Sequence, residues 1–443
     1  MIKRVYGAVK NFLNTPHFKK YFSNVFWLIS EKVFSLGISL VAGIYVARYL
    51  QPEGYGMLNY ALSFVGIFAS FSHLGIDKIL VRELARSPER KDEILGSCYV
   101  LKSIGSLTLF AVVTIILVFF MDNAPVTNSL IVIIASAEVF KAFDVVQSFY
   151  ASRVESKRFV KVQIIVNLVG NALKIALIFL DASIVWFAVV TALNSFGNGV
   201  GYVYTYWKLE ESPLNWVFRK AVAWMFIREA WPVTLQGFAL HTQARIDQVM
   251  LGNLMNNYEV GQYSVAMRFI EIFAFVPVLM VNAFAPAVTK ARASNQDLYY
   301  DRIVNFYRMM FILFLVTALP IFLFGERVIT MLYGVEYQAA GFLFSLFSIR
   351  LLFTNLGSAK SLYVVNESLF KNSLLNAIVG AITNITVNYF LIPIYGSIGA
   401  LIATVVSFTV SVFGVDMFFK KTRINNKLLF RAVTSFWKLN RIS

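Results

Sequence analysis

Charged side chains occur inside several long apolar stretches of the sequence, where a lipid bilayer would give them no water. A charge near the bilayer centre costs several kcal/mol, so it usually faces a partner or a wet cavity. The anions in these stretches are Glu31, Glu138, Asp144, Asp247, Glu271 and Asp416, and the cations are Lys32, Lys102, Lys141, Lys174, Arg245, Arg268, Arg308, Arg350 and Lys360. Three of them lie near helix ends and are expected to reach water along their side chains: Arg308, Lys360 and Asp416. The remaining interior is modestly cationic.

Spacing along a helix suggests which of these charges neutralise each other. Glu138, Lys141 and Asp144 follow one another at three-residue intervals, and Arg268 and Glu271 are also three apart. Side chains at that spacing meet on a helix surface. Two interpretations stay open for these five residues: they form local ion pairs that make burial tolerable, or they belong to a functional cavity.

Three cations have no opposite charge at pairing distance on their own helices: Lys174, Arg245 and Arg350. Arg350 also falls near the bilayer midplane, counted from the start of its predicted helix. An arginine pairs two phosphate oxygens with its planar guanidinium, and a lysine adds a point charge. These three residues are the leading candidates to hold an anionic substrate headgroup. The rest of the candidate set is Lys32, Lys102, Lys141 and Arg268.

Four titratable groups at membrane depth are placed to sense an ion gradient: Asp247, Glu271, Glu138 and His241. A structural role is the competing interpretation for each of them. Asparagines such as Asn384 and Asn388 could bind sugar hydroxyls, although interhelical hydrogen bonds are the favoured interpretation.

No enzymatic constellation emerges from the motifs. The sequence has no P-loop, no paired histidine ligands and no glycine-rich nucleotide loop. Its single cysteine, Cys98, excludes a zinc site built on several thiolates. We expect a protein without catalytic residues, resident metal or cofactor, which uses a proton or sodium gradient if transport is driven.

These charges must be positioned by membrane-spanning helices. The chain has 443 residues, of which 58% are hydrophobic and 14% are charged, whereas soluble domains carry roughly 25% charged residues. Each of about twelve apolar segments has roughly the 20 residues that a spanning helix needs. We predict an all-α polytopic membrane protein with helices at 24–48, 57–80, 95–120, 127–150, 161–180, 183–207, 231–253, 262–288, 303–325, 340–364, 372–392 and 397–419.

The net charge of +16 is distributed along one membrane face. Most lysines and arginines fall in alternate connections and in both terminal segments, which predicts cytoplasmic termini and excludes nucleic acid as the reason for the charge. We expect an amphipathic N-terminal segment at 1–23, an N-lobe at 24–207, a cytoplasmic linker at 208–230, a C-lobe at 231–419 and a basic tail at 420–443. The linker, with its tryptophans and arginines, predicts an interfacial amphipathic helix.

The two halves look related. Gly56 is followed five residues later by Ala61, after the first helix of the first half, and Gly261 is followed at the same interval by Ala266, after the first helix of the second half. A six-plus-six duplication is common among secondary transporters, whose substrate site lies between the repeats.

Four stretches in this order resemble the Wzx-type oligosaccharide flippases, in the polysaccharide-transport branch of the multidrug/oligosaccharidyl-lipid/polysaccharide exporter superfamily. They are ARYLQPEGYG (47–56), RIDQVMLG (245–252) continued by Glu259, Gly261, Tyr263 and Ala266, LYGVEY (332–337) with Ala339 and Ala340, and NYFLIPIYGSIGA (388–400). The resemblance covers nearly the whole chain. It implies two pseudo-symmetric six-helix lobes around a central cavity, in the bacterial cytoplasmic (inner) membrane.

The resemblance also implies a function, which is translocation of undecaprenyl-diphosphate-linked oligosaccharide units from the inner to the outer leaflet by alternating access, for O-antigen, lipopolysaccharide, capsule or exopolysaccharide synthesis. Its partners would be that lipid-linked oligosaccharide, membrane lipid, a polysaccharide polymerase and a chain-length regulator. A multidrug or cation antiporter of the same superfamily is the first alternative, and the cationic interior speaks against it. A polysaccharide polymerase or ligase is the second, and the short predicted outer loops speak against it.

Overall fold

The computed structural model describes residues 16–121 and 123–438, with side chains from residue 23 onward, and every element in these ranges is helical. The amphipathic segment predicted at 1–23 lies largely outside the described residues, as does the end of the basic tail. The main helices are α2 (Pro16–His73), α3 (Asp77–Arg86), α4 (Lys91–Phe120), α5 (Pro125–Ala137), α6 (Val145–Ser152), α7 (Lys157–Phe179), α8 (Ile184–Leu209), α9 (Lys220–Leu254), α10 (Asn257–Phe273), α11 (Phe275–Ser294), α12 (Gln296–Tyr333), α13 (Gln338–Phe347), α14 (Arg350–Asn366), α15 (Phe370–Thr409) and α16 (Lys420–Val433).

Two of the longest helices are broken where the sequence predicts a connection. α2 leaves helical geometry at Gln51, with φ 56° and ψ 170°, directly before Pro52. α15 does so at Gly396, with φ 54° and ψ −131°, shortly after Pro393. A proline disfavours helical geometry in the residue before it, and a positive φ ends regular helix. Each long helix therefore consists of two straight segments that match two predicted spans.

The chain is an all-α multi-pass membrane protein. Seven described helices are long and apolar enough to cross a bilayer, and the pair α13–α14, bent by 46°, would make an eighth. Most residues of the predicted spans are helical, but the span predicted at 57–80 is interrupted at residues 74–76 and the one at 340–364 is bent between α13 and α14. The number of twelve spans stays a prediction.

One predicted element is wrong in detail. The linker at 208–230 does not contain a separate interfacial helix, because α8 ends at Leu209, a short 3₁₀ turn covers Pro213–Asn215, and α9 then runs from Lys220 through the next predicted span. Pro232 lies inside α9, at the start of the predicted span, and does not separate the span from the linker residues before it. Trp224, 65% exposed, lies in this extension.

The chain forms two compact units. Unit 1 comprises 1–46 and 68–234, and unit 2 comprises 47–67 and 235–443. The segment 47–67, the second half of α2, thus belongs to the same unit as the C-terminal half of the chain. The predicted lobe boundaries stay a prediction, and the units are described one at a time.

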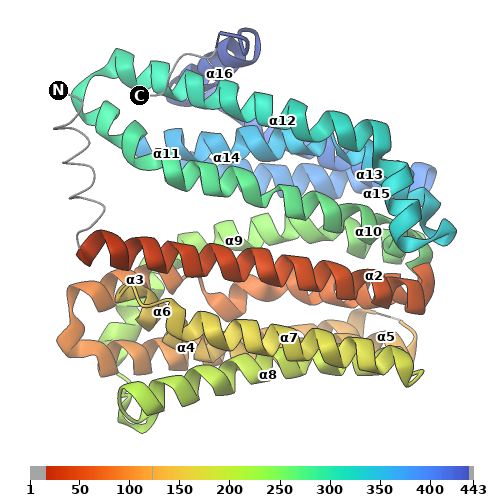
Figure 1. Cartoon of the computed structure of the whole chain (residues 1–443), viewed down its shortest axis with the longest axis horizontal. Coiled ribbons are helices and arrows are strands. Elements are labelled where there is room, and N and C mark those ends of the chain that lie inside the picture. Colours follow the sequence, from red (N-terminus) through yellow and green to blue (C-terminus); the bar gives the residue numbers. More distant parts are fainter. Residues whose placement is uncertain (1–15, 122, 439–443) are drawn as a thin grey trace. The chain divides into compact units, whose positions relative to one another are not determined.

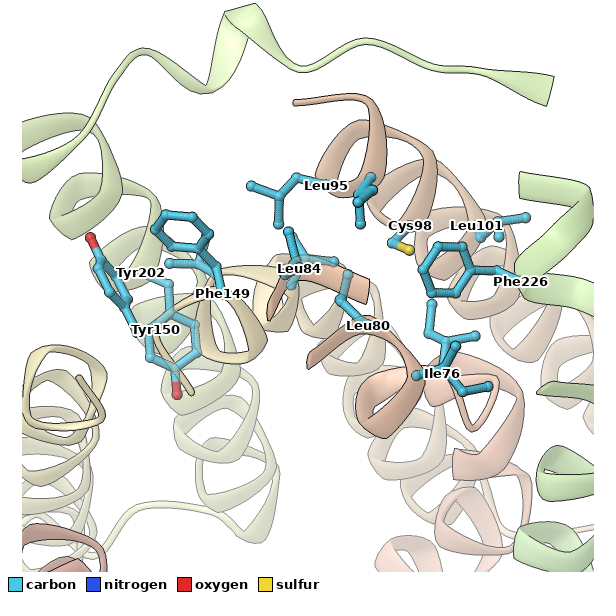
Figure 2. Close-up of a cluster of buried hydrophobic side chains, with 14 of the residues drawn as sticks. Ile76, Leu80, Leu84, Leu95, Cys98, Leu101, Phe149, Tyr150, Tyr202 and Phe226 are labelled. Atoms are coloured by element: carbon cyan, nitrogen blue, oxygen red, sulfur yellow. The ribbon is translucent and has the colours of Figure 1, made fainter. Parts of the chain in front are cut away.

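Unit 1 is organised around an apolar cluster that joins α3, α4, α6, α8 and the start of α9 (Figure 2). Leu80 from α3, Cys98 from α4 and Phe226 from α9 are fully buried in it. Unit 2 has its own cluster among α11, α12, α14 and α16, which includes Tyr307, Leu356 and Leu429. Each cluster fixes the helix ends that carry charged residues.

In unit 2, the two glycines that mark the sequence repeat lie at one helix crossing. A Cβ added to Gly56 would collide with the carbonyl oxygen of Asn257, and one added to Gly261 would collide with the carbonyl oxygen of Pro52. Each repeat motif therefore contacts the other through its glycine, as expected for elements related by a two-fold axis. Only glycine permits backbones to approach this closely.

We expect Gly261→Ala to destabilise the protein by about 1–3 kcal/mol, because the added methyl group forces the crossing apart. A suitable control is Gly43→Ala on α2, where a Cβ would meet nothing within 4 Å. That change should be neutral or stabilise the helix by about 0.5–1 kcal/mol. Thermal unfolding of both purified variants measures the difference, and equal melting temperatures would contradict the account of the crossing.

Candidate functional site

Unit 2 contains a buried carboxylate that is surrounded by neutral donors. Asp247, on α9, is 2% exposed. Its oxygens accept hydrogen bonds from Tyr263 Oη at 2.5 Å, Thr404 Oγ1 at 2.6 Å and Asn388 Nδ2 at 2.7 Å. These donors come from α10 and from both segments of α15 around Gly396. No lysine or arginine among the described residues forms an ion pair with Asp247.

Two asparagines of α15 leave amide atoms without partners at this depth. Asn384 is fully buried, and neither its Oδ1 nor its Nδ2 has a hydrogen-bond partner within the described chain. Asn388, one turn later, donates to Asp247 but its Oδ1 accepts nothing there. Residues four apart share a helix face. Carboxylate and amide oxygens are the ligands of hard cations such as Na⁺, so the chemistry of this set fits a small cation.

Arg350 stands at the break between α13 and α14. It is the first residue of α14, directly after the 46° bend. Its guanidinium lies 5.3 Å from the ring centroid of Phe408 and contacts the sulfur of Met267. Within the described residues, no carboxylate lies at ion-pair distance from it. Its half-buried side chain therefore offers a positive charge that the protein has not neutralised.

Arg245, predicted to have no partner on its own helix, has one on the next helix. Its guanidinium lies 3.4 Å from the carboxylate of Glu271 on α10, and both side chains are partly exposed. The local pair between Arg268 and Glu271, one of the two interpretations left open, is not among the ion pairs of the described residues, and Arg268 is exposed. The prediction considered only neighbours on the same helix, whereas packing of α9 beside α10 supplies Glu271 to Arg245.

Charges in unit 1 are largely paired. Lys102, fully buried, lies 2.5 Å from Asp77, and Lys141 lies 2.5 Å from Glu138, which also accepts a hydrogen bond from Ser72 at 2.7 Å. Glu138–Asp144 is a 3₁₀ helix. Its three residues per turn align positions 138, 141 and 144 in one row. The local ion pair is therefore the correct interpretation for Glu138 and Lys141.

A polar cavity of about 470 Å³ lies beside these pairs and is lined by His73, Asp77, Lys78, Asp144, Gln147 and Ser148. Sequence reasoning missed Asp77, which lies near the end of the predicted span 57–80 and 25 positions before Lys102. Tyr263 and Thr404 were also missed as Asp247 partners. One indication of their role was present in the sequence: Tyr263 belongs to the motif that continues from 245–252, and Thr404 lies just beyond the motif at 388–400.

The remaining candidates do not gather with these groups inside either unit. Lys32 is exposed on α2. Lys174, half-buried on α7, and His241, exposed on α9, each engage in an interaction, so Lys174 is not the free cation that the sequence suggests.

The three charges expected to reach water are instead buried in unit 2. Lys360 lies 2.7 Å from Asp416, which also accepts a hydrogen bond from Asn376 at 3.0 Å. Arg308 donates to Asn305, to Ser435 and to the carbonyl of Lys438. The C-terminal segment after α15 folds back over these side chains and blocks their route to water.

Comparison with known proteins gives consistent results. The sequence model of a family described as polysaccharide biosynthesis protein matches residues 22–292, which is more than half of the chain. The capsular polysaccharide biosynthesis protein CapF of Staphylococcus aureus is 21% identical over 389 residues, which cover 85% of this chain and 93% of the relative.

Two solved structures share the fold over nearly their whole length. The lipid II flippase MurJ, in an inward closed conformation, aligns with a TM-score of 0.70 and 14% identity, covering 93% of this chain and 91% of that one. A multidrug resistance MATE family transporter of the MOP superfamily, in an inward-facing conformation, aligns with a TM-score of 0.65 and 16% identity, covering 89% and 96%. At these identities the likeness concerns the fold.

We expect Asp416→Ala to destabilise the protein by about 3–5 kcal/mol, because the change leaves Lys360 buried without its counter-charge. Replacing both residues, as Lys360→Met with Asp416→Leu, should recover most of the loss. The matched control is Glu229→Ala, which removes the exposed partner of Arg82 and should cost about 0–1 kcal/mol. Denaturant unfolding in detergent measures all three, and a double variant as unstable as the single one would contradict the pairing argument.

Proposed function

Because the chain belongs to the family of polysaccharide biosynthesis proteins, we propose that it is a flippase for undecaprenyl-diphosphate-linked oligosaccharide repeat units. It moves them from the inner to the outer leaflet of the bacterial cytoplasmic membrane by alternating access. The family, the capsular relative and the flippase and transporter folds support transport of a lipid-linked polysaccharide in general. The diphosphate linkage of the substrate is our more specific proposal.

Arg350 is the observation that carries the substrate assignment. A diphosphate head brings about two negative charges into a region of low dielectric, where a compensating cation is needed. The guanidinium of Arg350 donates one hydrogen bond to the sulfur of Met267 and lies over the ring of Phe408, so most of its N–H groups stay available to a ligand. Arg268, exposed and without a salt bridge in the described chain, is a second candidate in the same unit. Arg245 could join them if substrate displaced Glu271 from its pair.

The Asp247 cluster supports ion coupling as part of this proposal. A buried carboxylate with three neutral donors and neighbouring unpartnered amide oxygens suits a transported Na⁺ or proton better than a fixed ion pair does. Glu138 and Glu271 are already paired with cations, so Asp247 is the stronger coupling candidate. The donors come from both sides of the break at Gly396, so occupancy would bias the relative position of the two segments of α15.

We expect Arg350→Ala to lower surface polysaccharide at least about ten-fold at unchanged protein level, because a charge-assisted phosphate contact is lost. Arg350→Lys should retain part of the activity. The assay complements a deletion strain and measures both surface polysaccharide and the lipid-linked oligosaccharide that accumulates inside. Arg327→Ala, at an exposed arginine on α12, is the control. Normal polysaccharide in Arg350→Ala would exclude the phosphate role, and a changed drug-susceptibility panel without polysaccharide loss would favour the antiporter.

We expect Asp247→Asn to abolish the stimulation of transport by an imposed Na⁺ or pH gradient in proteoliposomes, because the carboxylate that exchanges the ion is gone. Asn384→Ala should weaken Na⁺ stimulation while leaving any pH stimulation intact, which identifies the ion. Asp181→Asn, at an exposed position after α7, is the control. Undiminished gradient stimulation in Asp247→Asn would rule out this site as the coupling centre.

A further inference from the structure

Helices α7 and α8 of unit 1 lie side by side (Figure 1). They border a groove of about 510 Å³. This volume lies within the roughly 300–1,000 Å³ typical of small-ligand sites. Gly197 and Gly201 of α8 line the groove and face Val166 and Val162 of α7. Their missing side chains let the two helices approach closely, with the valine side chains packed against the glycine backbone at the floor of the groove. Ile165, on the wall, is 62% exposed, so the groove opens to the outside of the unit.

The chemistry of this groove changes along its length. Its inner part is apolar and is lined by valine, isoleucine and glycine. Its other end carries Lys157 and Lys161, from the start of α7, and Lys208, from the end of α8. A ligand that fits both parts has an apolar chain at one end and a negative charge at the other.

The three lysines are not neutralised by the protein. The nearby acids are engaged elsewhere: Glu155 and Glu210 pair with Arg158 at 2.8 and 2.9 Å. Glu211 pairs with Lys91, and that hydrogen bond lowers the pKa of the Glu211 carboxyl. Lys157, Lys161 and Lys208 are exposed, and none forms an ion pair with a described residue. The end of the groove is therefore a site of uncompensated positive charge.

Aromatic side chains mark the depth of these lysines in the membrane. The ammonium of Lys157 lies 5.1 Å from the ring centroid of Trp27, and that of Lys208 lies 5.8 Å from the ring of Tyr204. Tyr204 and Trp207 are largely exposed. Tryptophan and tyrosine gather at the level of lipid headgroups. The lysines thus belong at headgroup depth, with the apolar part of the groove beneath them, in the leaflet that the charge distribution makes cytoplasmic.

We propose that this groove binds one anionic phospholipid of the cytoplasmic leaflet, with its headgroup phosphate at Lys157, Lys161 and Lys208 and one acyl chain along Val162, Ile165 and Val166. Charge complementarity selects this occupant. A free phosphate would leave the apolar part unused, and a zwitterionic lipid would leave the lysines uncompensated. The site lies on the outside of unit 1, and its occupancy does not depend on which substrate the protein transports.

Native mass spectrometry of the purified full chain tests the proposal. The probe is an equimolar mixture of phosphatidylglycerol and phosphatidylcholine with identical acyl chains. The test variant carries Lys157→Gln, Lys161→Gln and Lys208→Gln, and the control carries Lys290→Gln, Lys371→Gln and Lys420→Gln, which remove the same charge from exposed positions in unit 2. A second variant, Ile165→Trp, fills the groove without changing its charge.

We expect the wild-type chain and the control to retain phosphatidylglycerol in preference to phosphatidylcholine. In the test variant, the ratio of bound phosphatidylglycerol to bound phosphatidylcholine should fall at least about ten-fold. Ile165→Trp should reduce retention of both lipids. An unchanged preference in the triple test variant would overturn the proposal. So would one-for-one displacement of phosphatidylglycerol by added undecaprenyl diphosphate, because the groove would then be a substrate route. Surface polysaccharide measured in the same variants separates this result from the transport proposal.

Discussion

A charge inside a bilayer needs either an opposite charge or water, and this requirement explains the buried ion pairs in both units. Lys102 is held by Asp77 in unit 1, and Lys360 is held by Asp416 in unit 2. In each case the two partners come from different elements, so the ion pair also fixes the packing of those elements. Removing one partner leaves an uncompensated charge, which is why such pairs constrain the fold more strongly than exposed ones do.

Asp247 and Arg350, both in unit 2, depart from this pattern. Asp247 has three neutral donors instead of a cation, and Arg350 has a sulfur atom and a ring instead of an anion. Both stand beside interruptions of helix: Asp247 is bonded to residues on either side of the Gly396 break, and Arg350 follows the bend between α13 and α14. Broken helices are where transporters place substrate and ion sites. In this unit, these two charged side chains, which have no ion-pair partner among the described residues, thus lie next to breaks in the helices.

The glycine crossing at Gly56 and Gly261 gives unit 2 a close backbone contact that side-chain packing could not provide. It joins the second half of α2 to α10, and α10 carries Tyr263, a partner of Asp247. A shift of α10 at the crossing would therefore also move Tyr263 relative to the Asp247 carboxylate. In unit 1, Gly197 and Gly201 let α8 pack closely against Val166 and Val162 of α7, at the groove that these two helices line.

Hydropathy and the order of motifs were sufficient to predict the all-helical membrane class, the family and the breaks near Gln51 and Gly396, because apolar length and proline or glycine act locally. The ion pair between Glu138 and Lys141 could also be anticipated, because the two residues are three apart on one helix. Only the tertiary structure decided which charges are paired. Arg245 meets Glu271, Lys102 meets Asp77, and Asp247 meets Tyr263 and Thr404. These partners lie on different helices, and spacing along one helix carries no information about which helix packs beside it.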